Sequence, residues 1–162
     1  MRHTIIAVVI LLATVSSANA QTRHSLTSSP RLWATVDACR SSASGDVVGL
    51  RGSMPGGGND SEQMFMSFEL QYRNAQERWQ TIPGGTALVS VGSARYASRQ
   101  AGRDFNLASS TAAGTVLRGV VSFEWRRGHV IVRRVRRATT AGRAPSAGAS
   151  PPGYSAARCS IS

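Results

Sequence analysis

The amino-acid sequence predicts an all-β domain built as a two-sheet antiparallel sandwich. Apolar residues recur at every second position in several short runs, and turns rich in Gly, Pro or polar residues separate those runs. No segment carries apolar residues at the three-to-four-residue spacing of an amphipathic helix, and no internal repeat is visible. We therefore expect strands alone to build the core.

The first three strands are expected at residues 32–36, 47–54 and 64–72. The segment Pro55 to Asp60 breaks the second strand, because its three consecutive glycines disfavour continued pairing. The third strand has the clearest alternation, with one apolar face made of Met64, Met66, Phe68, Leu70 and Tyr72. This face is expected to be core.

A polar turn leads from the third strand to a fourth at residues 78–82, which Pro83, Gly84 and Gly85 are expected to end. Weaker patterns predict two further strands, at residues 88–91 and 103–107. These two segments are short and alternate less regularly than the others.

A strong hairpin follows. Its first strand carries a second apolar face, Leu117, Val121, Phe123 and Trp125, which we expect to pack against the apolar face of residues 64–72. The turn at 126–129 contains Gly128, which can take the positive φ of a tight hairpin. In the return strand, 130–138, the apolar phase shifts between Val132 and Val135, which predicts a β-bulge near 133–134.

One part of this pattern carries a resemblance to a known family. Phe68 to Arg73, a short turn, and Trp79 to Ile82 together resemble the middle hairpin of fibronectin type III modules, and Thr115 to Trp125 is similar to their penultimate strand. Leu117 stands where that family usually has a buried Tyr. The resemblance implies a fibronectin III-like or immunoglobulin-like sandwich. The pattern also resembles uncharacterised exported proteins of actinobacteria, and it implies no particular ligand.

The N-terminus predicts export. Arg2 precedes a short apolar core, Ile5 to Val15, and Ala18-Asn19-Ala20 supplies the small residues of a signal-peptidase site. The alternative is a membrane anchor, but this core falls well short of the roughly 20 apolar residues that a spanning helix needs. We expect residues 1–20 to be a signal peptide and the secreted protein to have no membrane span.

The mature chain is expected to be a single domain. Residues 21–30 are rich in Ser and Thr and predict a flexible lead-in, and residues 31–162 form the sandwich. Residues 141–153 contain mainly Ala, Gly, Ser and Pro, which predicts a low-complexity loop before a last strand at 155–161. The mature chain has two cysteines, Cys39 and Cys159, and an even count in an exported protein predicts one disulfide. Two unpaired thiols are the alternative.

The mature chain is strongly basic. It has 18 Arg, no Lys and 8 acids, so its net charge is about +10. A GC-rich genome is the simplest interpretation of Arg in place of Lys, but the physical consequence is the same in either case. Guanidinium groups stay charged and bind carboxylates, phosphates and sulfates bidentately. A basic exported protein meets acidic cell-wall polymers, anionic lipid head groups or extracellular nucleic acid. The expected partner is an anionic cell-wall polymer or another extracellular protein.

No catalytic, cofactor-binding or metal site is predicted. His129 is the one histidine inside the expected fold, and it lies in the hairpin turn, where an exposed position is the simpler interpretation. Glu69 and Glu124 fall on outward positions of two strands that can be neighbours, so they could form a carboxylate pair. Ion pairing with arginines is the simpler interpretation there too.

Six arginines in the hairpin are the one feature that suggests a function. They are the candidate anion-binding residues Arg126, Arg127, Arg133, Arg134, Arg136 and Arg137. The alternative is an edge strand that charge protects against pairing with other chains. No aromatic residue is expected among these arginines on the outward positions. The leading hypothesis is a non-enzymatic extracellular binding module. A polyanion-binding protein is the first alternative, and a secreted hydrolase the second.

Overall fold

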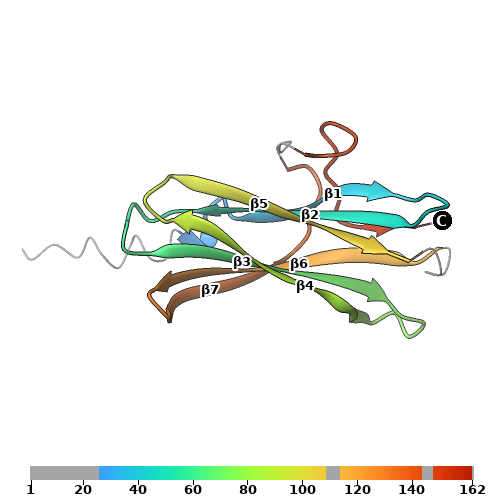
Figure 1. Cartoon of the computed structure of the whole chain (residues 1–162), viewed down its shortest axis with the longest axis horizontal. Helices are drawn as coiled ribbons and strands as arrows, with labels where there is room; N and C mark the ends of the chain where they lie inside the picture. Colours follow the sequence, from blue (N-terminus) through green and yellow to red (C-terminus); the bar gives the residue numbers. More distant parts are fainter. Residues whose placement is uncertain (1–25, 109–113, 144–147, 162) are drawn as a thin grey trace, which may run out of the picture.

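The structure, a computed structural model, describes residues 26–108, 114–143 and 148–161. Two antiparallel sheets make up this part of the chain (Figure 1). The three-stranded sheet contains, in order, β1 (Trp33–Arg40), β2 (Asp46–Pro55) and β5 (Ser98–Leu107). The five-stranded sheet contains, in order, β4 (Trp79–Ser93), β3 (Gln63–Arg73), β6 (Val116–Arg127) and β7 (Val130–Ala138), and β8 (Cys159–Ser160) pairs with β6. The predicted all-β, two-sheet antiparallel architecture is confirmed.

Several expectations concern residues outside the described ranges. The predicted signal peptide, residues 1–20, and the expected mature start at Gln21 lie there. In the described part of the expected lead-in, Leu26 is buried and belongs to the hydrophobic core. Within the described ranges, no helix combines the length and apolar character needed to cross a membrane.

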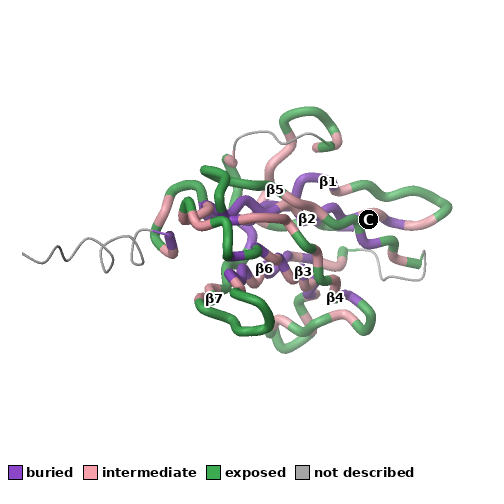
Figure 2. The backbone as a smooth tube through the Cα atoms, turned by 60° about the vertical axis from the view of Figure 1, so that its left-hand side comes forward, coloured by how far each residue is buried: buried purple, intermediate pink, exposed green. Residues whose placement is uncertain are grey.

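The core follows from the two-residue alternation of the strands. The two predicted apolar faces are fully buried, except that Tyr72 is half-buried at the rim. However, β3 pairs directly with β6, with Phe68 opposite Val121 and Met66 opposite Phe123. The expectation that one face packs against the other is therefore corrected: the two faces are neighbours within one sheet and do not meet across the core. They lie side by side, and Val36 and Leu50 of the other sheet belong to the same core. The buried stretches of both sheets are purple in Figure 2.

Glycine allows the two sheets to approach closely at one point. Gly119 of β6 is buried, and a Cβ at this position would lie 2.6 Å from Cδ2 of Leu50 on β2. Such a distance is too short for two carbon atoms, so a larger side chain would require Leu50 to move. Gly119 has no side chain on the buried face of β6, and the side chain of Leu50 occupies that space.

The expected strands at 78–82 and 88–91 are one continuous strand, β4. Pro83, Gly84 and Gly85 do not end it. Thr81 pairs with Gln71 and Thr86 pairs with Glu69, so residues 82–85 form an irregularity opposite Leu70. Because β4 is an edge strand, the missing N–H of proline breaks no second ladder.

The end of the chain is less regular than expected. Of the predicted strand at 155–161, only Cys159 and Ser160 form a strand, although Ala156 makes a bridge to Val36 of β1. The predicted bulge in β7 exists, one residue earlier than expected. Trp125 pairs with Arg133 and Arg126 pairs with Ile131, which leaves Val132 as the extra residue.

The predicted disulfide is present. Cys39 lies in β1 and Cys159 in β8, with their Cα atoms 5.5 Å apart and a sequence separation of 120. The bridge therefore connects the three-stranded sheet to the five-stranded sheet. It also holds the C-terminal segment, which returns to the sandwich along β1.

Candidate anion-binding surface

The outward surface of the five-stranded sheet gathers arginines and aromatic rings from four strands. Cross-strand pairing brings them together: Phe65 of β3 lies opposite Glu124 of β6, which lies opposite Arg134 of β7. We call this surface the arginine face. Its charged and aromatic members are Phe65, Glu69, Trp79, Arg118, Glu124, Arg126, Arg134 and Arg136, and Arg158 of the C-terminal segment joins them beside Trp79.

Glu124 lies between two arginines of this face. Arg126 donates from Nε to Oε2 at 2.8 Å, and Arg134 donates from Nε to Oε1 at 2.8 Å. Burial works to raise the pKa of Glu124, but the hydrogen bonds and charges of the two arginines outweigh it and hold the pKa below its ordinary value. One negative charge thus faces two positive charges, and a positive excess remains.

Glu69 has a similar environment one strand away. Thr81, Gln71 and Arg136 each donate a hydrogen bond of 2.6 Å to its carboxylate. Burial works to raise the pKa of Glu69, but these hydrogen bonds and the charge of Arg136 together lower it. The two glutamates lie on neighbouring strands, as expected, and both are engaged by arginines, which agrees with the ion-pairing interpretation.

Aromatic rings support two arginines on this face. The guanidinium carbon of Arg126 lies 4.4 Å from the centre of the Phe65 ring, and that of Arg118 lies 4.2 Å from the Trp79 ring. Arg158 also approaches Trp79, at 5.6 Å. Such stacking holds a guanidinium in place while leaving its N–H groups able to donate. Along the hairpin itself no aromatic residue lies among the outward arginines, as expected, but Phe65 of the neighbouring strand β3 stacks on Arg126.

Positive charge concentrates around Arg118. Its pKa is lowered first by burial and then by the positive charges of Arg158 and Arg136, while Glu69 opposes the shift. The Arg118 Nε donates a 2.9 Å hydrogen bond to Gln71, a neutral group. This region therefore has three guanidinium groups that act on one another and one nearby carboxylate, which Arg136 already engages.

The six predicted arginines separate into two sets. Three point outward and belong to the arginine face: Arg126, Arg134 and Arg136. The other three, Arg127, Arg133 and Arg137, share the side of β6 and β7 that carries Trp125 and Val121. Arg137 donates to the backbone oxygen of Thr27 at 2.8 Å.

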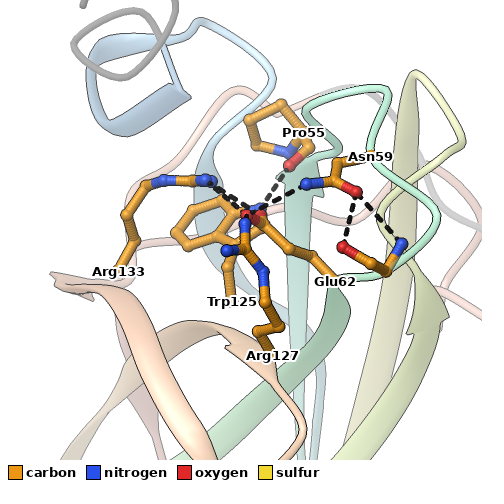
Figure 3. A network of polar contacts seen from close by, with 7 residues as sticks. Pro55, Asn59, Glu62, Trp125, Arg127 and Arg133 are labelled. Carbon is orange, nitrogen blue, oxygen red and sulfur yellow. Dashed lines mark hydrogen bonds and ion pairs between the residues drawn. The ribbon is translucent and has the colours of Figure 1, made fainter.

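Arg127 and Arg133 bind the buried carboxylate of Glu62 (Figure 3). Arg133 donates to both oxygens of Glu62, at 3.0 and 2.9 Å, and Arg127 donates to Oε1 at 3.2 Å. Beside them, the indole N–H of Trp125 donates to the backbone oxygen of Pro55 at 3.0 Å. This cluster attaches the β2–β3 loop to the β6–β7 hairpin. Arg133 therefore stabilises the fold by pairing with Glu62.

Sequence reasoning missed Arg118, Arg158, Phe65 and Trp79 as members of the face. Period-two alternation places Phe65 outward, on the same side as Glu69. Alternation does not tell which strand pairs with β3. That strand is β6, and it places Arg126 over the Phe65 ring. His129 is exposed in the hairpin turn, as expected, and Gly128 has a φ of 56°.

No metal centre is apparent in residues 26–108, 114–143 and 148–161, where no three His, Cys, Asp or Glu side chains come together in a way that could hold an ion. Comparison with known proteins found no family model and no curated protein that matches this chain.

Proposed function

We propose that the protein is an exported, non-enzymatic binding module whose arginine face holds an anionic polymer. One observation carries this proposal: Arg118, Arg136 and Arg158 gather on one side of the sheet, with Glu69 as the carboxylate that opposes them. Guanidinium groups bind sulfate and phosphate through paired N–H donors. A sulfated or phosphorylated polymer of the cell envelope is the class of ligand that fits this surface.

Two features support a module of the fibronectin type III kind. Strands one, two and five share one sheet, and strands four, three, six and seven share the other in that order, as in fibronectin type III modules. The β3–β4 hairpin, with Tyr72-Arg73 and Trp79, is the segment that carries the sequence resemblance. In this proposal the sandwich is a rigid scaffold, and an outer sheet surface provides the binding residues.

Salt-dependent retention on a sulfated matrix such as heparin tests the proposed face. The test variant replaces Arg118 and Arg158 by Gln, since neither arginine forms an ion pair with an acid among the described residues. We expect elution at clearly lower salt. The slope of log affinity against log salt concentration should become less steep by about two, one for each arginine removed.

The matched control replaces Arg40 and Arg103 by Gln. These arginines are exposed on β1 and β5, in the other sheet, and their loss changes the net charge equally. The control should elute close to the unmodified protein. Equal shifts for the two variants would mean that overall charge, and not this face, holds the polymer.

A further inference from the structure

Three connections meet at one end of the molecule, which we call the loop pole. They are the β2–β3 loop, the β4–β5 turn and the β6–β7 turn (Figure 1). Backbone hydrogen bonds hold the first two together: Gly58 donates to the oxygen of Ala94 at 2.9 Å, and Ala94 donates to the oxygen of Glu62 at 2.8 Å. Glu62 in turn binds Arg127 and Arg133 of the β6–β7 hairpin. The loop pole is therefore a braced surface.

Exposed apolar side chains concentrate at this pole. Val130, Ile131 and Val132 are consecutive and are 65%, 38% and 37% exposed, and Tyr96 in the β4–β5 turn is 38% exposed. Over the described surface the other large hydrophobic side chain with comparable exposure is Leu88, in the middle of β4. Leaving such groups in water costs roughly 25 cal/mol for each Å² of apolar surface. Their gathering at one end indicates a partner that covers them.

Arginines lie against Tyr96 and next to the three aliphatic residues along the chain. Arg95 and Arg99 lie over the Tyr96 ring at 4.7 and 3.9 Å, and Arg95 donates to the Tyr96 hydroxyl at 2.6 Å. In the hairpin, Arg126 and Arg127 precede the exposed residues 130–132 along the chain. The nearby carboxylates Glu62 and Glu124 each bind two arginines, and Asp60 of the β2–β3 loop lies near enough to Arg95 to act on its charge. The arginines still outnumber these three acids, so the pole keeps a positive excess.

Exposed apolar side chains with arginines nearby match the boundary between lipid headgroups and acyl chains. Arginine can place its charge at anionic headgroups while short aliphatic groups enter the apolar layer below, and tyrosine suits the interface between them. A dissolved anionic polymer offers the charge but no apolar phase for Val130, Ile131 and Val132. An anionic lipid bilayer provides both negative charge for the arginines and an apolar layer for the exposed side chains, so it is the ligand that fits the loop pole.

We propose that the loop pole docks on anionic lipid membranes, with Val130, Ile131, Val132 and Tyr96 entering the headgroup boundary. This surface is separate from the region around Arg118 and Trp79, and membrane docking goes beyond the proposed polymer binding. The membrane is approached by the end of the sandwich, which leaves the centre of the arginine face accessible.

Co-sedimentation of the purified protein with vesicles tests the docking. One set of vesicles contains phosphatidylcholine alone, and the other contains phosphatidylcholine with phosphatidylglycerol. We expect binding to the anionic vesicles and little to the neutral ones. Replacing Val130, Ile131 and Val132 by Thr keeps the β-branched side chains that suit a strand but adds hydroxyls. This variant should bind anionic vesicles about tenfold more weakly or worse.

The matched control is Leu88→Thr, at the exposed aliphatic position away from the pole, which should bind vesicles like the unmodified protein. Retention on heparin, measured in parallel, should be the same for the triple variant and the unmodified protein. Unchanged vesicle binding by the triple variant, equal binding to neutral vesicles, or no vesicle binding at all would overturn the proposal. An equal loss on heparin would also overturn it, because the tip would then contact polymer. If only the variant with Arg118 and Arg158 replaced loses heparin retention, that result tests polymer binding by the arginine face and leaves the membrane-docking result unaffected.

Discussion

Glu62 shows how one carboxylate can hold two elements of a strongly basic chain together. Its side chain is 2% exposed, and the guanidinium of Arg133 that binds it belongs to a side chain that is 17% exposed. Removing two charges from water is costly unless the pair is close and well hydrogen-bonded. Here Nη2 of Arg133 donates to both oxygens, and Arg127 and Asn59 each donate to Oε1, so both carboxylate oxygens accept hydrogen bonds.

Replacing Glu62 by Gln should lower the free energy of unfolding by about 3–5 kcal/mol, since it leaves the Arg133 charge enclosed without its partner. Urea unfolding, followed by the fluorescence of the tryptophans, measures the change. Glu77→Gln is the matched control, because Glu77 also pairs with an arginine, Arg73, but its side chain is 78% exposed. The control should change stability by less than about 1 kcal/mol. Similar small losses for both variants would show that the Glu62 cluster does not brace the pole.

At the scale of the strand, alternation predicted the buried faces well and the neighbours of each strand poorly. Phe68 and Phe123 are both buried, as their phase requires. Alternation reports which side of a strand is apolar, but pairing partners depend on contacts distant in sequence. Two faces expected to meet across the core therefore turned out to be neighbours in one sheet. Leu50 of the other sheet, which fills the space over Gly119, has no signal in the sequence of β6.

The candidate site was predicted in part, for the same reason. The run of arginines in the hairpin was visible in the sequence, but its division into two sides depends on the alternation of β7 and on the bulge at Val132. Trp79 and Arg118 are separated by almost forty residues in the chain and come together because β4, β3 and β6 are adjacent. The aromatic support of the arginines could therefore not be found from local spacing.

At the scale of the whole molecule, the Cys39–Cys159 bond connects the first strand to the last and joins the two sheets. A bridge that closes 120 residues restricts the unfolded chain strongly. The chain-entropy relation gives about 4–5 kcal/mol for a loop of this size, against a total stability of about 5–15 kcal/mol for typical domains.

Reduction should therefore lower the urea midpoint of the protein markedly. The paired variant Cys39→Ser with Cys159→Ser should show the same low midpoint with or without reductant. Titration of free thiols in denatured, unreduced protein provides the check on the bond itself, and should find none. Two reactive thiols per chain, or a midpoint that reductant leaves unchanged, would contradict this account of the stability.

The central claim is that the arginine face binds anionic polymer, and nuclear magnetic resonance of the ¹⁵N-labelled protein tests it most directly. Titration with a sulfated oligosaccharide should shift the side-chain Nε signals of Arg118, Arg136 and Arg158 and the indole signal of Trp79. The signals of Arg40 and Arg103 on the other sheet should stay in place, and added salt should reverse the shifts. Shifts that spread evenly over all arginines, or that concentrate on Arg40 and Arg103, would contradict the claim.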